Sequence, residues 1–166
     1  FAMSFGKPAQ GFNATKHRMI LNPKWNCQYG PGHTNWSGAL NDGKSRGGEP
    51  YYCPKGWKRF AVQFEEQDDD FDHIYDKWPI AYHGTKFDFT MMITLSGLKV
   101  TCGSGVYLSP CIEYSAHPRY AKPVKLDLSK AKQAEWSSEY INEFSKYDGK
   151  WVQVVFACRV KPGSFT

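Results

Sequence analysis

The stretch Trp151-Val-Gln-Val-Val-Phe-Ala-Cys-Arg-Val160 gives the clearest strand pattern in the chain. Its apolar residues follow one another almost without interruption, whereas a strand with one solvated face alternates between apolar and polar residues. A nearly continuous apolar run of this kind is typical of a strand that is buried on both faces of a sheet. The stretch therefore predicts a strand that other elements cover from both sides.

Three further strands are predicted earlier in the chain. Residues 57–64 combine aromatic and branched side chains in partial alternation, and residues 78–83 and 106–108 form two shorter runs. The strand at 78–83 is expected to begin just after Pro79, because proline lacks a backbone N–H group and is tolerated at the first position of a strand. His83 then lies at the C-terminal end of this strand.

Short helices are predicted between and after these strands. Residues 88–95 have apolar side chains at helical spacing, with Met92 expected in the core and Gly97 as the stop. Residues 112–120 and 130–147 predict two more helices. Long amphipathic helices are scarce, so a β-rich fold is favoured over a helical bundle.

The composition limits the chain to one domain. A length of 166 residues, with 41% apolar and 16% aromatic residues, is enough for one core and too short to expect two. Fifteen glycines and ten prolines favour a β-rich fold with many turns. Residues 1–50 are dense in turn-forming residues and are expected to be a loop-rich extension, with the core in residues 51–166.

The cysteine content favours a reducing compartment inside the cell, and the lack of a long apolar run favours no membrane contact. The sequence has no run of 18 apolar residues and no signal peptide pattern. Five cysteines are an odd number without close pairs, which fits the cytoplasm or nucleus, or alternatively the mitochondrion. Cys27, His33 and Cys53 lack the paired spacing of a zinc site, so no metal is expected. The net charge of +5 is spread along the chain.

Two short segments carry a family resemblance. Tyr82-His83-Gly84-Thr85 ends one predicted strand, and Gly105-Val-Tyr-Leu-Ser-Pro110 begins the next after an intervening helix. In this order and spacing, together with Ser115-Ala116, they resemble the poly(ADP-ribose) polymerase type of ADP-ribosyltransferase, whose motif is called H-Y-E. The resemblance is closest to the transferase-like C-terminal region of Neuralized-like proteins, and covers roughly residues 51–166.

The resemblance implies a fold and a co-substrate. The fold is expected to be α+β, with two small, packed, mainly antiparallel sheets, short flanking helices and an NAD cleft between the strands of His83 and Tyr107. The co-substrate is NAD, and no metal is implied. Cleavage of the nicotinamide glycosidic bond passes through an oxocarbenium-like state, so such a site must hold the ribose and the leaving group in a fixed geometry.

The resemblance also implies roles for individual residues. His83 binds the adenosine-side ribose, Gly84 pairs with the nicotinamide amide, Tyr107 packs on the nicotinamide ring and Ser115 bonds the carboxamide. Tyr120 is the candidate for a second stacking aromatic. His117 is the runner-up for that position. Apart from the resemblance, the Thr85 hydroxyl can add a contact.

The third residue of the motif has no match in this sequence. In the family, a catalytic Glu lies on a strand after the one that ends at Val160, and this chain ends at Thr166. Either that Glu lies beyond Thr166, or the protein binds the donor without catalysis, or another carboxylate substitutes. The late acids Glu135, Glu139 and Glu143 lie on a predicted helix and fit its solvated face better.

The expected activity is mono-ADP-ribosyl transfer from NAD to an acceptor, with release of nicotinamide. A protein acceptor is expected, and basic residues near aromatic ones leave nucleic acid open as an acceptor. The alternative is a transferase-like module that binds NAD, ADP-ribose or a protein partner without chemistry. The sequence does not indicate the oligomeric state.

Overall fold

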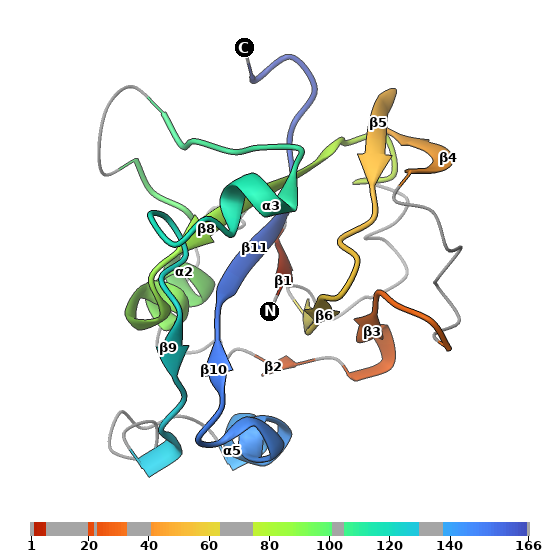
Figure 1. Ribbon diagram of the computed structural model, residues 1–166. Helices are drawn as coiled ribbons and strands as arrows, with labels where there is room; N and C mark the ends of the chain where they lie inside the picture. The colour runs from red at the N-terminus through yellow and green to blue at the C-terminus, as the bar shows by residue number, and fades with distance from the viewer. Residues whose placement is uncertain are drawn as a thin grey trace.

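The described part of the chain is a small mixed α/β protein with a few short helices and small antiparallel sheets. This agrees with the predicted combination of short helices and small sheets. The computed structural model in Figure 1 describes residues 2–5, 20–21, 23–32, 41–63, 75–100, 105–129 and 138–165.

The elements are short throughout. The strands are β1 (Ala2–Phe5), β2 (Ile20–Leu21), β3 (Cys27–Gln28), β4 (Asn41–Arg46), β5 (Glu49–Tyr52), β6 (Lys58–Arg59), β7 (Val62–Gln63), β8 (Ile80–Thr85), β9 (Val124–Lys125), β10 (Trp151–Val152) and β11 (Val154–Arg159). The helices are α2 (Thr90–Ser96), α3 (Ile112–Ser115) and α5 (Ser138–Phe144), and the 3-10 turns are η1 (Pro23–Trp25), η2 (Phe87–Phe89) and η3 (Ser145–Tyr147).

The main sheet has five strands in the order β3-β6-β1-β11-β8. β11 therefore lies inside the sheet, and β8 forms one of its edges. β11 pairs antiparallel with β8 and parallel with β1, which is also parallel to β6. This mixed sheet differs from the predicted pair of mainly antiparallel sheets. The other described pairings are three two-stranded antiparallel ribbons.

The N-terminal extension contributes two strands, β1 and β3, to this sheet. β1 lies between β6 and β11, with Ala2 opposite Val155 and Phe5 opposite Cys158. The expectation of a loop-rich extension did not include this strand, because four residues carry too little periodicity to reveal it and its partner is distant in the sequence. Residues of the extension are thus part of the main sheet.

β11 is buried on both faces, as its apolar run predicts. On one face, Val155 and Ala157 pack in a cluster with Tyr82 and with Ile112 of α3. On the other face, Phe156 and Cys158 form a cluster against which Ile93 of α2 packs, together with Leu98 and Leu108. The β8–β11 pair is therefore covered by α3 on one face and by α2 on the other.

The helix predicted at 112–120 is shorter than expected, because α3 ends at Ser115. α2 ends at Gly97, as predicted, where a φ of 74° suits glycine and its N–H donates to the Ile93 carbonyl. The expectation that Met92 is in the core is wrong, because its side chain is 63% exposed. The last predicted helix is seen as α5 followed by η3, and residues 130–137 lie outside the described part.

The strand predicted at 57–64 is interrupted. β6 and β7 are separated by Phe60 and Ala61, both buried. The Ala61 N–H donates to the side-chain carbonyl of Asn26 at 2.9 Å instead of to a neighbouring strand. This side-chain bond replaces a ladder bond and ends the first strand.

No helix in the described ranges combines the length and the apolar character that crossing a membrane requires.

The buried thiol of Cys158 leads to a reactivity prediction. Burial raises the pKa of this thiol from 9.0 to about 12. Because the thiolate is the reactive form, Cys158 should resist alkylation by iodoacetamide in the native protein at about pH 8, whereas the exposed Cys111 should be labelled. Peptide mapping by mass spectrometry measures both.

The same shift predicts a loss of stability in alkali. The stabilising contribution is fully present below pH 9.0 and is lost as pH rises towards the folded value of about 12, because the unfolded chain gives up the proton first. Rapid labelling of Cys158 without unfolding would contradict this account. Cys102 lies outside the described residues.

Candidate functional site

The candidate site is built on the edge strand β8. It begins at Ile80, directly after Pro79, which confirms the predicted start. In the register with β11, His83 faces Phe156 and Gly84 faces Val155. Antiparallel strands alternate their hydrogen bonds between the two sides, so His83 bonds towards β11 while Tyr82 and Gly84 direct their N–H and C=O groups to the outer edge.

The outer edge of β8 is paired at one position only among the described residues. Tyr82 and Ser109 exchange two bonds, Tyr82 N–H to Ser109 O at 2.7 Å and Ser109 N–H to Tyr82 O at 3.0 Å. If the antiparallel ladder continued, its next position would join Gly84 to Tyr107. No main-chain hydrogen bond joins these two residues in the described structure, so the pairing stops one step before Gly84.

The strand predicted at residues 106–108 is therefore wrong. The segment forms one isolated bridge at Ser109 and no ladder. Its apolar residues gave the pattern of a strand, and Leu108 does pack against the Phe156 cluster. Burial of Leu108 explains the apolar pattern without continuous pairing.

The side chain of His83 connects β8 to the segment of Tyr107, where the main-chain pairing is absent. Its Nδ1 lies 3.0 Å from the Tyr107 carbonyl oxygen. A carbonyl oxygen only accepts hydrogen bonds, so Nδ1 carries the hydrogen and donates. In the neutral ring, Nε2 then has a free lone pair and can accept a hydrogen bond from a ligand hydroxyl.

Tyr107 presents its ring to solvent. The side chain is 74% exposed, although its main-chain carbonyl is held by His83. A large aromatic ring with this exposure has little apolar contact with the protein itself. The ring is thus accessible to a ligand beside β8.

Gly84 lies directly beneath α3. A Cβ atom added to this glycine would overlap the Ser115 carbonyl oxygen and would lie 3.0 Å from the Cβ of Tyr120. Glycine is therefore required for the close approach of α3 and the following loop to β8. Ser115 and Tyr120 cover a face of the sheet at Gly84, while its N–H and C=O groups point along the sheet to the free edge.

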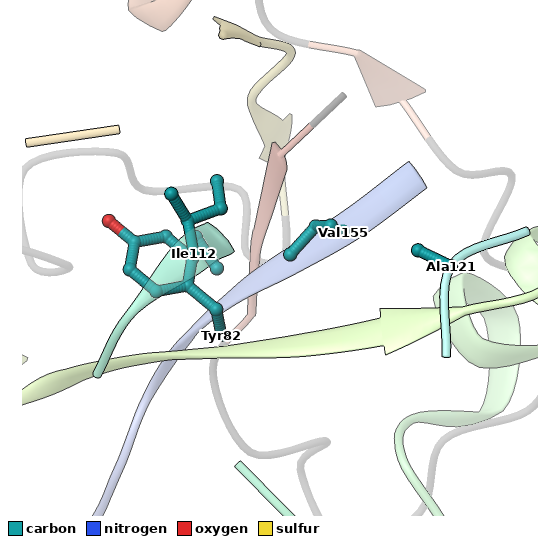
Figure 2. Close-up of a cluster of buried hydrophobic side chains, with 5 residues drawn as sticks. Tyr82, Ile112, Ala121 and Val155 are labelled. Atoms are coloured by element: carbon teal, nitrogen blue, oxygen red, sulfur yellow. The ribbon is translucent and has the colours of Figure 1, made fainter. Parts of the chain in front are cut away.

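The Ser115 hydroxyl is already engaged. Ser115 is buried, and its Oγ donates to the Tyr82 carbonyl at 2.9 Å. Figure 2 shows Tyr82 of β8 beneath Ile112 of α3, the helix that carries Ser115, with Val155 on the neighbouring strand β11. Ser115 thus fixes α3 on β8, and its one hydroxyl hydrogen cannot be donated to a ligand carboxamide while this bond is made.

Tyr120 lies in an exposed aromatic pair. Its hydroxyl lies 2.9 Å from the hydroxyl of Tyr114, and the ring centroids are 5.3 Å apart with a tilt of 37°. The hydrogen bond to Tyr120 raises the pKa of Tyr114. His117, the runner-up for the stacking position, lies with its ring centroid 6.3 Å from that of Tyr120. Both stacking candidates therefore belong to one group beside Gly84.

Thr85 does not present its hydroxyl at the surface. The residue is buried, and Oγ1 donates to the Lys86 carbonyl at 3.5 Å. It lies opposite Val154 in the register with β11. Its place is in the core rather than on the outer edge of β8.

Glu143, the one late acid whose side chain is described, is not assembled with these residues. The carboxylate of Glu143, on α5, lies 3.9 Å from the Lys58 ammonium and 3.6 Å from the Lys146 ammonium. Figure 1 shows α5 beside β10, at the opposite end of the molecule from α3. The side chain of Glu139 and all of Glu135 are outside the described structure. The observed arrangement thus gives Glu143 a structural role.

No cluster of three or more metal-ligating side chains occurs in the described ranges. Cys27 and Cys53 lie in one buried cluster with Tyr29 and Tyr51, and His33 is not among the described residues.

Gln153 was not predicted from the sequence, and it contacts the loop that carries Tyr120. Its Nε2 donates to the Ala116 and Ala121 carbonyls, both at 2.7 Å. The only signal in the sequence is a polar residue within the apolar run from Trp151 to Val160.

Comparison with known proteins adds no relative. No protein-family model, no curated protein and no solved structure matches the chain. The family resemblance therefore depends on the residues of the sequence alone.

Proposed function

We propose that this chain binds NAD at the outer edge of β8 and transfers its ADP-ribose to an acceptor, releasing nicotinamide. The fold in this proposal is that of an ADP-ribosyltransferase. The observation that carries it is the interrupted pairing of β8, which leaves Gly84 with N–H and C=O groups directed to an edge that Tyr107 does not pair.

A carboxamide fits this edge by its chemistry. It has one C=O acceptor and N–H donors on the same planar group, as a peptide unit has. A nicotinamide carboxamide can therefore accept from the Gly84 N–H and donate to the Gly84 C=O, in place of the missing ladder partner. This pairing uses no side chain, so it is available although the Ser115 hydroxyl is engaged.

The aromatic and imidazole side chains can then hold the rest of the donor. The exposed ring of Tyr107 offers an apolar face to the nicotinamide, and Tyr120 lies beside Gly84 to offer a second. The Nε2 of His83 can accept a hydrogen bond from a ribose hydroxyl. Together they orient the donor for loss of nicotinamide from the ribose C1′, to which the acceptor nucleophile then bonds.

A second candidate is a module that binds NAD, ADP-ribose or a protein partner without chemistry. The observation that favours it is the position of Glu143 on α5, where its carboxylate contacts Lys58 of β6 and Lys146 of η3 instead of the β8 edge. The acceptor in the first proposal is a protein, with nucleic acid as the alternative. Turnover separates the two candidates.

The test is a calorimetric titration with NAD, combined with chromatographic detection of released nicotinamide. His83→Ala and Tyr107→Ala should each weaken NAD binding about tenfold, because each removes one direct contact of roughly 1–1.5 kcal/mol. Tyr52→Ala is the matched control, since this tyrosine is also exposed but lies on β5. It should bind NAD like the unmodified chain.

Three outcomes separate the candidates. Binding and nicotinamide release that both decline in the two site variants support the transferase. Binding without release supports the donor-binding module. Absence of NAD binding to the unmodified chain at millimolar concentration would refute both the donor site and the transferase.

A further inference from the structure

One side-chain amide, that of Gln153, is hydrogen-bonded to both ends of the loop that carries Tyr120. Gln153 lies in the one-residue break between β10 and β11. Its Nε2 donates to two main-chain carbonyls, those of Ala116 and Ala121, each at 2.7 Å. A primary amide nitrogen has two hydrogens, so both donors of Gln153 are used on this loop.

The two acceptors lie at the ends of the same loop. Ala116 caps α3, and Ala121 is fully buried in the cluster of Tyr82 and Val155. Between them the chain forms a turn. The His117 carbonyl accepts hydrogen bonds from the N–H groups of Tyr120 and Ala121 at 2.8 and 3.0 Å. Gln153 thus ties the start of the loop to its end, and its main-chain position is set by β10 and β11.

The loop places Tyr120 against β8. The Cβ of Tyr120 approaches the position that a Gly84 Cβ would take to 3.0 Å, so any shift of the loop moves the tyrosine relative to the edge of the strand. The Tyr114 hydroxyl then holds the ring from its outer side. The orientation of this aromatic face depends on a residue that does not itself reach the edge.

We propose that Gln153 is a positioning residue for the donor: its amide sets the loop at 116–121, and through the loop it sets Tyr120 beside Gly84. This inference rests on the proposed function, because Tyr120 matters for binding only if the nicotinamide lies at this edge. The partner of the site is the nicotinamide ring of NAD, and Gln153 acts on it only through Tyr120.

The loop requires a residue at position 153 with two hydrogen-bond donors on one atom, and a side chain of the same size is not enough. An ionised glutamate has nearly the same shape as glutamine but only accepts hydrogen bonds, so it would face two carbonyl oxygens without a donor. Methionine is neutral and of similar length and also lacks a strong donor. Gln153→Glu and Gln153→Met should therefore share one effect on the loop while differing in charge.

A double-mutant cycle on NAD affinity tests the inference. Gln153→Met should raise the NAD dissociation constant about fivefold in the unmodified chain, the size of a lost aromatic contact. In a Tyr120→Ala background the same change should raise it less than about twofold, because the group that Gln153 positions is gone. Gln153→Glu should also weaken NAD binding in the unmodified chain and much less in the Tyr120→Ala background. It provides a second variant if the methionine variant folds poorly.

Two controls separate positioning from general destabilisation. Val152→Ala is adjacent in sequence but removes contacts with the distant cluster of Phe60 and Leu126, so it should lower the melting temperature without changing NAD affinity. Amide hydrogen exchange needs no ligand. It should accelerate at Tyr120 and Ala121 in both Gln153 variants, and not in Val152→Ala.

The outcomes are distinct. If the Gln153 variants weaken NAD binding by the same factor with and without Tyr120, the positioning role is refuted while the donor site stands. The same holds if exchange at Tyr120 and Ala121 is unchanged in these variants. If the unmodified chain does not bind NAD, the proposed function fails, and the role of Gln153 in donor binding fails with it.

Discussion

Gly84→Ala is expected to abolish NAD binding and to lower the melting temperature by about 6–12 °C. The added methyl group would overlap the Ser115 carbonyl oxygen and crowd Tyr120, so α3 must move away from β8. Overpacking of this kind costs about 1–3 kcal/mol, and the upper end applies because the obstacle is main chain. For a chain of this length, 3 kcal/mol corresponds to about 6–12 °C. Differential scanning calorimetry and an NAD titration measure the two effects.

Gly105→Ala is the matched control for this substitution. Among the described residues, no atom lies within 4 Å of the position of a Cβ added to Gly105, and the φ of Gly105 is outside the left-handed region. It precedes Tyr107 by two residues, so it tests the same neighbourhood. It should leave melting within about 1 °C of the unmodified chain. Equal stability of the two variants would show that α3 does not rest on Gly84.

Phe156→Ala is expected to destabilise the fold by about 3–5 kcal/mol. Phe156 is fully buried on β11, and it packs with Cys158 in a cluster that Ile93 and Leu98 complete. Its loss leaves a cavity between the sheet and α2, in addition to the lost transfer free energy. Phe156 also faces His83 in the register, so NAD binding should weaken together with stability. Urea denaturation followed by tryptophan fluorescence measures the change.

The control for this prediction is a phenylalanine that is not in the core. Phe165 is 50% exposed, and Phe165→Ala should change the free energy of unfolding by less than about 0.5 kcal/mol. If Phe156→Ala costs no more than Phe165→Ala, β11 is not the buried strand on which the sheet depends.

Local chemistry explains which elements were predictable. The start of β8 follows from the missing N–H of Pro79, and the end of α2 follows from the left-handed conformation of Gly97. Burial of β11 on both faces follows from its continuous apolar run. Each of these depends on residues that are adjacent in the sequence, so the pattern contains the information.

Pairing between distant segments was not predictable in the same way. β1 lies beside β11 although about 150 residues separate them, and nothing in its four residues specifies a parallel partner. The apolar run at 106–108 suggested a strand, but Leu108 is apolar because it packs against the Phe156 cluster. A periodic pattern records burial, and pairing is only one way to achieve burial.

The candidate site was predictable as a neighbourhood and less so as a set of contacts. Gly84, Ser115 and Tyr120 do come together, and the adjacent His83 contacts the main chain of Tyr107. Their roles remain predictions, and the structure adds that Ser115 and Thr85 are buried and already hydrogen-bonded. Gln153 could not be found from the sequence, because its two acceptors are main-chain carbonyls more than 30 residues away.

The central claim is that the nicotinamide carboxamide pairs with the main chain of Gly84. The most direct measurement is a titration of the ¹⁵N-labelled chain with NAD, observed by the amide resonance of Gly84. The account predicts a saturable shift of this resonance, reproduced by nicotinamide alone and absent for the Gly105 amide or much smaller there. A saturable response elsewhere that leaves the Gly84 amide unchanged, or no response to millimolar NAD, would contradict it.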